Sequence, residues 1–470
     1  MMNKLVGSIK QAVIDSGLKD GMTVSFHHHL RNGDYVLNMV MEAIAELGIK
    51  DLTVNASSLF DAHRPLKEHI KNGVVTHILT DYMSAELGRF ISAGNMANPV
   101  QFRTHGGRPC DIENGTTPID VAFIAAPASD CMGNCTGKLG KSACGSLGYA
   151  MPDAKNAKFT VVITDELHPY PLTGWSIPET DVNEVVVVES IGDPRGIVSG
   201  TTKITRDPVG LSMAMTAVDV IKASGLLKEG FSFQTGAGGA SLAAAKYLKD
   251  VMLREKIRGS FGLGGITGYM VDMLNEGCFD SLMDVQCFDL KAVESIRDNP
   301  RHCEISATHY ASPGAKSAVV DSLDVVILGA TQIDTDFNIN VHTDSNGRIM
   351  GGSGGHSDTA AGAKLSMIIA PLSRARLPIV TDRVTCISTP GSTIDVLVTQ
   401  KGVAVNPKDA ELRQRLIDAK INVVDIHELK AMAERTSGVP EKPAIGDRVV
   451  ADVIYRDGTV IDRICEVRED

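Results

Sequence analysis

The stretch Leu323-Asp324-Val325-Val326-Ile327-Leu328-Gly329-Ala330 decides the fold, because a similar stretch occurs earlier in the chain. The earlier copy is Ile119-Asp120-Val121-Ala122-Phe123-Ile124-Ala125-Ala126, and in both an acidic residue precedes a short apolar run typical of a buried strand. Two further matches keep the same order: residues 18–24 with 227–233, and residues 157–163 with 363–369. All three pairs lie roughly 205 residues apart, which predicts two related domains.

Apolar strands alternate with amphipathic helices along the chain, a pattern typical of parallel sheets covered by helices. We therefore predict an α/β protein of two related domains, residues 1–210 and 211–470, with mainly parallel sheets. The boundary falls in a turn-rich segment between Ile191 and Ser212. In residues 448–464, Asp457-Gly458 separates two strand-like runs, which predicts a β-hairpin with a type I′ turn packed on the second domain.

The composition is that of an ordinary globular protein. The chain has 470 residues, 43% apolar and 22% charged, with a net charge of -11. This charge argues against binding of nucleic acid or an anionic membrane, and no apolar run is long enough to span a bilayer. The first residues lack the apolar core of a signal peptide. Nine irregularly spaced cysteines, with no Cys-x-x-Cys pair, predict reduced thiols, no metal site and a cytoplasmic location.

The glycine-rich stretch Gly351-Gly352-Ser353-Gly354-Gly355-His356-Ser357-Asp358 is the strongest candidate for chemistry. A loop with so few Cβ atoms lets another backbone or a ligand come close, and its N–H groups can hold developing negative charge. The alternative is a turn that only needs positive φ. Other glycine loops, at residues 236–240 and 262–265, do not complete the Gly-x-Gly-x-x-Gly pattern, so a dinucleotide cofactor is not expected.

His27-His28-His29 follows a predicted strand and precedes Arg31. Neighbouring side chains on an extended segment point to opposite faces, so a shared metal ion is the weaker interpretation. A loop that hydrogen-bonds a carboxylate substrate is the stronger one, since His and Arg both suit that task. The bland alternative is one buried histidine and two exposed ones. The cationic turn around His105 carries the same two interpretations.

Gln332 stands just past the predicted strand in residues 324–329, where its side chain would emerge at the carboxyl edge of the sheet. A glutamine can orient a substrate but cannot accept an acyl group. Nearby Asp334 occupies the repeat position of Asp130, which predicts a structural role for it.

Four segments carry a resemblance to a known family. They are residues 24–28, 145–150, 234–243 and 354–360. In this order they resemble the α subunit of citrate lyase, and the likeness extends along essentially the whole chain. It implies a CoA-transferase-like fold of two α/β domains. It also implies exchange of acetate for citrate on a thioester, with no permanently bound cofactor and with CoA or a phosphopantetheine-type thioester as substrate.

The resemblance implies partners and site residues as well. The partners are the citrate lyase β (citryl lyase) and γ (acyl carrier) subunits, and a homo-oligomer is expected. The implied catalytic residues are Gln332, Gly354, Gly355 and Ser357. The implied substrate-binding residues are His27, His28, His29, Arg31 and His105. The implied thioester-binding residues are Gly236, Gly238, Gly239, Gly264, Gly265, Gly351 and Gly352.

The wider CoA-transferase superfamily commonly uses a glutamate that forms an acyl anhydride and then an enzyme thioester, and Gln332 stands at the matching place. Two interpretations stay open: citrate attacks the acetyl thioester directly, or this copy is impaired. The substrate alternative is citramalate, and the alternative of another class is a non-catalytic CoA-binding scaffold.

Overall fold

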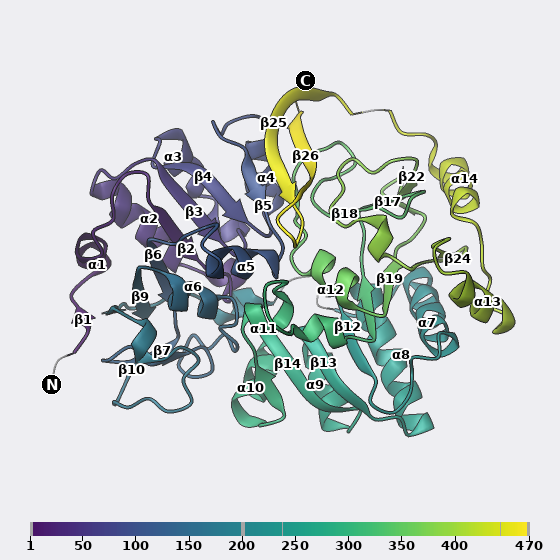
Figure 1. The fold of residues 1–470 in the computed structure, drawn as a ribbon, viewed down its shortest axis with the longest axis horizontal. Helices are drawn as coiled ribbons and strands as arrows, with labels where there is room; N and C mark the ends of the chain where they lie inside the picture. Colours follow the sequence, from purple (N-terminus) through teal and green to yellow (C-terminus); the bar gives the residue numbers. More distant parts are fainter. Residues whose placement is uncertain (1–2, 199–202, 237, 442, 468–470) are drawn as a thin grey trace.

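The structure is a computed structural model that describes residues 3–198, 203–236, 238–441 and 443–467. Two large sheets lie side by side, and helices pack around each of them (Figure 1). The first sheet has ten strands in the order β1-β11-β9-β6-β2-β3-β4-β5-β25-β26. Its strands are β1 (Leu5–Val6), β2 (Thr23–Phe26), β3 (Leu52–Ala56), β4 (Val75–Thr80), β5 (Val100–Phe102), β6 (Val121–Ala125), β9 (Phe159–Thr164), β11 (Glu184–Val187), β25 (Ile445–Ile454) and β26 (Val460–Val467).

The second sheet has eight strands in the order β15-β14-β13-β12-β16-β19-β23-β24. Its strands are β12 (Ser232–Thr235), β13 (Gly259–Ile266), β14 (Phe279–Cys287), β15 (His302–Glu304), β16 (Val325–Leu328), β19 (Leu365–Ile369), β23 (Val396–Thr399) and β24 (Gly402–Val405). Within both sheets the strands pair in parallel, except for the two antiparallel hairpins β25–β26 and β23–β24. The predicted α/β fold with mainly parallel sheets is confirmed.

Three smaller sheets extend from these two. They are β10 (Leu167–His168) with β7 (Ala128–Asp130) and β8 (Cys135–Thr136), then β18 (Ile339–Asn340) with β17 (Gln332–Asp334) and β22 (Val380–Thr381), and β20 (Ser373–Arg374) with β21 (Leu377–Pro378).

Helices follow the amphipathic pattern of the sequence. In α2 (Val36–Glu46), the side chains of Val36, Val40 and Ile44 recur on one helical face and are buried. The other helices of the first half are α1 (Ile9–Asp15), α3 (Leu66–Lys71), α4 (Ala85–Ser92), α5 (Gly107–Glu113) and α6 (Ala150–Asn156). Those of the second half are α7 (Pro208–Ala223), α8 (Gly239–Glu255), α9 (Gly268–Asn275), α10 (Leu290–Asp298), α11 (Ala307–Ala311), α12 (His356–Gly362), α13 (Ala410–Asp418) and α14 (Ile426–Ser437). Among the described residues, no helix combines the length and the apolar character needed to cross a bilayer.

The sequence repeat is also a structural repeat. The first sheet contains the run β9-β6-β2-β3-β4-β5, and the second contains β19-β16-β12-β13-β14-β15 in the same relative places. The repeated aspartates do the same work: Asp120 Oδ2 accepts the N–H of Thr23 at 2.8 Å, and Asp324 Oδ2 accepts that of Ser232 at 2.9 Å. The two halves are therefore related α/β units.

Asp130 and Asp334 form identical turns in the two halves. Each carboxylate accepts the backbone N–H groups two and four residues ahead, and also the side-chain amide of Asn134 or Asn338. The predicted structural role of Asp334 is confirmed, because its oxygens are occupied by its own turn.

The C-terminal hairpin differs from the prediction in the sheet that it joins and in the type of its turn. Although it was assigned to the second domain, β25 pairs in parallel with β5, with Ala451 opposite Val100, and so extends the first sheet. In Figure 1 the yellow chain runs from α14 across the top of the molecule to reach β25. The turn is also not type I′, which needs two residues with positive φ, whereas in this turn only Gly458 has one, at 87°. The Gly458 N–H donates to Tyr455 O at 2.9 Å, as in a type I turn followed by a left-handed glycine.

Candidate active site

The glycine loop of residues 351–355 lies against the first half, at the carboxyl ends of its strands. The Gly354 N–H donates to Asp81 O at 3.1 Å, and the His105 N–H donates to Gly354 O at 2.9 Å. Gly354 has a φ of 51°, and a Cβ added to it would stand 3.2 Å from His105 Nε2. The glycines are therefore needed for the close approach of another backbone, one of the two roles predicted for them. We call this junction of the two halves the seam.

Three histidines from the end of β2 form the first-half wall of the seam. His27, His28 and His29 are 5%, 3% and 1% exposed, so the alternative with two exposed histidines is wrong. The His28 ring stacks on Tyr149 and His105, with centroid distances of 4.8 and 5.6 Å. Across the seam, Gln286 Nε2 donates to His28 O at 2.9 Å, so the histidine turn is anchored to β14 of the second half.

Burial keeps these histidines neutral. It lowers the pKa of His27 to about 4, and the pKa values of His28 and His29 fall well below their ordinary value, since neighbouring histidines add to the effect of burial. His27 Nε2 accepts the Ala125 N–H at 2.8 Å, which leaves the ring proton of neutral His27 on Nδ1. Neither that Nδ1 nor the two ring nitrogens of His29 find a partner in the described part of the chain. These histidines therefore bring uncharged, buried ring nitrogens without hydrogen-bond partners to the seam.

Arg31 supplies the charge that the histidines lack. Its guanidinium carbon lies 5.2 Å from the ring centroid of Phe60 in the first half and 4.8 Å from that of Phe288 in the second. Its backbone has a φ of 52°, a costly conformation for a residue with a side chain. Within the residues that the structure describes, no carboxylate pairs with it, and its buried Nη1 has no partner.

The other buried arginines nearby are neutralised. Arg108 makes a two-pronged pair with Asp153 at 2.7 Å on each arm, and Arg103 pairs with Asp111. Arg31 therefore differs from these arginines in having a guanidinium that is not neutralised by a described carboxylate. This planar group suits the binding of a carboxylate from outside the chain.

His105 is oriented by a carboxylate from the end of β4. Its Nδ1 lies 2.8 Å from Asp81 Oδ2, which turns Nε2 toward the glycine loop. Burial raises the pKa of Asp81, although the bond to His105 opposes this. A carboxylate that fixes one imidazole nitrogen and aims the other is a common arrangement for moving a proton or holding an oxyanion.

Some backbone N–H groups of the glycine loop have hydrogen-bond acceptors within the described residues, and others do not. The N–H groups of Gly351, Ser353 and Gly354 bond to His342 O, His342 Nε2 and Asp81 O. Those of Gly352 and Gly355 have no acceptor within the described residues. These two N–H groups are the ones available to an oxyanion.

Ser357 contacts the glycine loop, whereas the side chain of Gln332 is held elsewhere in the second half. The Ser357 hydroxyl is fully buried, donates to Ser388 O at 2.7 Å and lies 2.7 Å from the Ser353 hydroxyl of the loop. Gln332 Oε1 accepts from Asn340 Nδ2 and from both the N–H and the hydroxyl of Thr385, at 2.7–3.0 Å. Gln332 lines a separate cavity of about 460 Å³, together with residues of β21, β22 and the chain that follows α14. The structure does not bring Gln332 together with the histidines.

The remaining predicted glycines fall into two places. Gly264 and Gly265 in β13 pack under the seam, Gly264 against the Gln234 amide and Gly265 against the Phe288 ring that contacts Arg31. Gly236, Gly238 and Gly239 lie farther along, between the end of β12 and the start of α8, where Gly239 packs on the backbone of Thr205.

Several seam residues were not predicted from the sequence: Asp81, Tyr149, Gln286, Phe288 and Tyr310, whose hydroxyl packs against Gly355 of the glycine loop. Asp81 carried a usable signal, because it is an acidic residue that directly follows a strand of a parallel sheet, where ligand-binding side chains gather. The others carry no motif of their own.

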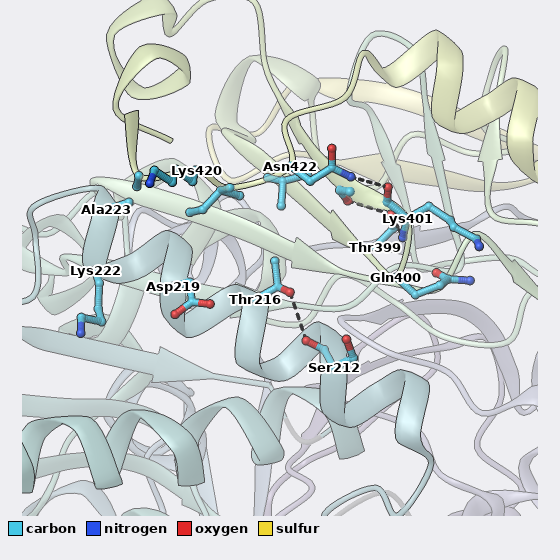
Figure 2. A pocket seen from close by; sticks show the side chains of 14 residues that line it. Ser212, Thr216, Asp219, Lys222, Ala223, Thr399, Gln400, Lys401, Lys420 and Asn422 are labelled. Atoms are coloured by element: carbon cyan, nitrogen blue, oxygen red, sulfur yellow. Dashed lines mark hydrogen bonds between the residues drawn. The ribbon is translucent and has the colours of Figure 1, made fainter. Parts of the chain in front are cut away.

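Another cavity lies away from the seam. About 770 Å³ in volume, it lies between α7 and the β23–β24 turn, where Figure 2 shows Thr216 and Asp219 of the helix opposite Gln400 and Asn422. None of the predicted site residues lines it. Among the described residues, no group of three or more His, Cys, Asp or Glu side chains is arranged to hold a metal ion.

Comparisons with known proteins agree with one another. A family model described as citrate lyase, alpha subunit (CitF) matches residues 2–467. The citrate lyase alpha chain of Klebsiella pneumoniae is 51% identical over 465 residues, which cover 99% of this chain and 92% of that one.

Two solved structures add to this. The putative citrate lyase alpha subunit of Streptococcus mutans, in complex with citrate, superposes with a TM-score of 0.98 at 49% identity, over 100% of this chain and 92% of that one. The malonate decarboxylase alpha subunit of Acinetobacter baumannii superposes with a TM-score of 0.69 at 17% identity, over 93% and 89% of the two chains, and so shares the fold.

Proposed function

The chain belongs to the family of citrate lyase alpha subunits, and we propose that within this family it exchanges acetate for citrate on an acetyl thioester. The products are a citryl thioester and acetate. The observation that carries this proposal is Arg31, a cation that has no acidic partner among the residues described and is held between aromatic rings of both halves. The Streptococcus mutans relative, captured with citrate, supports citrate as the carboxylate that Arg31 receives.

The seam suits a direct reaction between two substrates. A carboxylate oxygen of citrate attacks the acetyl carbonyl, forming a mixed anhydride and releasing a thiolate. The thiolate then attacks the citryl carbonyl of the anhydride, and acetate leaves. No enzyme acyl group is needed, which agrees with a glutamine at residue 332. Both steps place negative charge on a carbonyl oxygen, which the N–H groups of Gly352 and Gly355 are free to stabilise.

The neutral histidines have a distinct task in this scheme. A charged imidazolium would compete with Arg31 for the citrate carboxylates, whereas neutral His27 and His29 donate hydrogen bonds without fixing the substrate too strongly. Their burial also keeps water from the thioester and the anhydride, which would otherwise hydrolyse.

The family name implies an assembly, and we propose its members. The thioester is carried by a γ acyl-carrier subunit, and a β subunit cleaves the citryl product. CoA or a phosphopantetheine-type arm enters as substrate, and no cofactor is held permanently. A homo-oligomer is expected within the assembly. All nine cysteines are free, which supports the expected reducing, cytoplasmic compartment.

The test is a transfer assay. Purified chain is mixed with acetyl-CoA and citrate, and citryl-CoA is measured by mass spectrometry, with citramalate in a parallel reaction. We expect citryl-CoA from the parent chain and from the Arg463→Gln control, whose exposed arginine pairs with Asp452 in the hairpin. Arg31→Gln should lower kcat/KM for citrate about 100-fold, in line with the loss of a buried charged hydrogen bond. The proposal fails if the parent chain forms no citryl thioester on either CoA or the loaded carrier. A preference for citramalate would replace the substrate but keep the reaction.

A further inference from the structure

Asp358, in α12, joins three distant parts of the chain. Its carboxylate is fully buried. Oδ1 accepts the hydroxyl of Thr104 at 2.9 Å, and Oδ2 accepts the N–H of Gly106 at 2.9 Å. Both donors belong to the loop that follows β5 and that carries His105. Asp358 therefore binds the first half to the start of α12 in the second.

The third partner of Asp358 comes from the hairpin. Arg456, in the turn between β25 and β26, donates from Nε to Asp358 Oδ1 at 3.4 Å and from Nη2 to Ala311 O at 3.1 Å. A Cβ on Gly106 would collide with Ala311 O and the Asp358 carboxylate, and one on Gly107 would stand 3.1 Å from the Thr104 hydroxyl and 3.4 Å from the Arg456 backbone, so these segments are closely packed. The guanidinium thus bridges α11 and α12 from the edge of the first sheet.

These contacts converge on His105 and the glycine loop. Thr104 and Gly354 form a β-bridge, and the His105 N–H donates to Gly354 O at 2.9 Å. Residues 104–106 are therefore held on one side by Gly354 and on the other by Asp358. A shift of Asp358 would move His105 relative to the N–H groups of the glycine loop.

We propose that Arg456 is a positioning residue for the transfer reaction: by binding Asp358 and Ala311, it holds the 104–106 loop against α12 and so fixes His105 beside the glycine loop. This inference rests on the proposed function. It assigns a role at the seam to a residue of the last hairpin, more than 300 positions from His105 along the chain.

The charge balance around Asp358 makes the proposal testable. Burial raises the pKa of Asp358 to about 6, while Arg456, the Gly106 N–H, the Thr104 hydroxyl and His105 oppose that rise. Other titratable groups that face it are the hydroxyls of Tyr149, Tyr310 and Tyr455. Arg456 is the permanent positive charge among these groups, so its removal should raise the pKa of Asp358 further.

The first measurement does not depend on activity. Hydrogen exchange of the peptide that covers residues 103–107 is compared in the full-length parent, Arg456→Gln, Arg456→Lys and the exposed hairpin control Arg463→Gln. We expect the amides of His105 and Gly106 to exchange roughly tenfold faster in Arg456→Gln and at the parental rate in the other two variants. Unchanged exchange in Arg456→Gln would overturn the proposal, and so would equal loss of protection in Arg463→Gln.

The second measurement is the pH profile of citryl-CoA formation. In Arg456→Gln we expect kcat to fall about tenfold at neutral pH and the acidic limb to move up by roughly one unit, because Asp358 takes up its proton more readily. Arg456→Lys should restore both. An unshifted acidic limb, or equal damage from Lys and Gln, would refute a positioning role. If the parent chain itself shows no transfer while the exchange result holds, the proposed function fails and the placement of the loop by Arg456 stands.

Discussion

The guanidinium carbon of Arg31 lies 4.8 Å from the ring centroid of Phe288, so a residue that follows β2 and one that follows β14 hold each other across the seam. Gly265 lies beneath the same ring, where any side chain would displace it. The orientation of the cation in the first half therefore depends on an aromatic ring in the second.

The first prediction concerns Phe288→Leu. Leucine keeps the apolar contact but removes the ring face, and a desolvated cation–π contact contributes about 0.5–2 kcal/mol. We expect the Kd for citrate, measured by calorimetry, to rise by roughly 2- to 30-fold with little loss of thermal stability. The control is Phe90→Leu, which removes a comparable contact with Lys71 away from the seam. Equal citrate affinity in the parent and Phe288→Leu would show that the ring does not support Arg31.

The second prediction concerns Gly354→Val. A valine at positive φ is strained by about 1–2 kcal/mol, and its Cβ would meet the His105 ring. We expect a folded protein whose transfer activity is abolished. Gly174→Val is the matched control, because Gly174 also has positive φ but open space around it. It should lose similar stability and keep activity, whereas an active Gly354→Val protein would remove the loop from the mechanism.

The third prediction concerns Gln332. Its carbonyl oxygen accepts three hydrogen bonds, so Gln332→Ala should lower the free energy of unfolding by about 1–3 kcal/mol. Gln332→Glu keeps all three bonds and should fold normally. After incubation with acetyl-CoA, mass spectrometry should find no thioester adduct on the parent chain, and borohydride should not inactivate it. If Gln332→Glu instead gains orders of magnitude in turnover and forms such an adduct, this chain is an impaired member.

The fourth prediction is a pH dependence of stability. Burial lowers the pKa of His356 to about 4, whereas an unfolded histidine titrates near 6.5. Between these values the unfolded state binds a proton that the native state does not. The stability contributed by neutral His356 is therefore complete above about pH 6.5 and is lost as the pH falls toward 4, with a slope of roughly 1.4 kcal/mol per unit.

Urea unfolding between pH 4 and 7 is measured for the parent and for variants, because other buried histidines such as His27 contribute with the same sign as His356. Asp358 acts with the opposite sign, because its raised pKa stabilises the native state below about pH 4 and that gain is lost as the pH rises through 6. The comparison of variants removes this background. His356→Gln should flatten the acid loss relative to the parent, while the exposed His309→Gln should leave it unchanged. Parallel curves for the parent and His356→Gln would contradict the prediction.

The repeat could be predicted from the sequence because both halves contain the same buried apolar strands in the same order. Asp120 and Asp324, which precede two of these strands, also make equivalent hydrogen bonds in the structure. The hairpin could not be placed, because period-two alternation identifies a strand but not the edge with which it pairs. Its turn was misassigned because Asp-Gly also suits a type I turn with a left-handed glycine.

The seam was partly predictable for the same physical reason. His27 and His105 follow strands of a parallel sheet, so the carboxyl edge gathers them. Phe288 and Tyr149 were missed because an isolated aromatic residue looks the same in a core and in a site. Gln332 was selected by its place past a strand and by the resemblance, and no local pattern indicated that Thr385 and Asn340 would occupy its oxygen.

The pairing of β25 with β5 also governs how the chain can fold as it is made. Residues 100 and 451 are neighbours in the sheet but roughly 350 residues apart in order of synthesis, a separation that slows folding. Until the last hairpin leaves the ribosome, β5 presents an unpaired edge of the kind that recruits other strands. In a nascent chain the edge of β5 is therefore open to aggregation until the hairpin has been made. This is the interval in which chaperones can protect that edge.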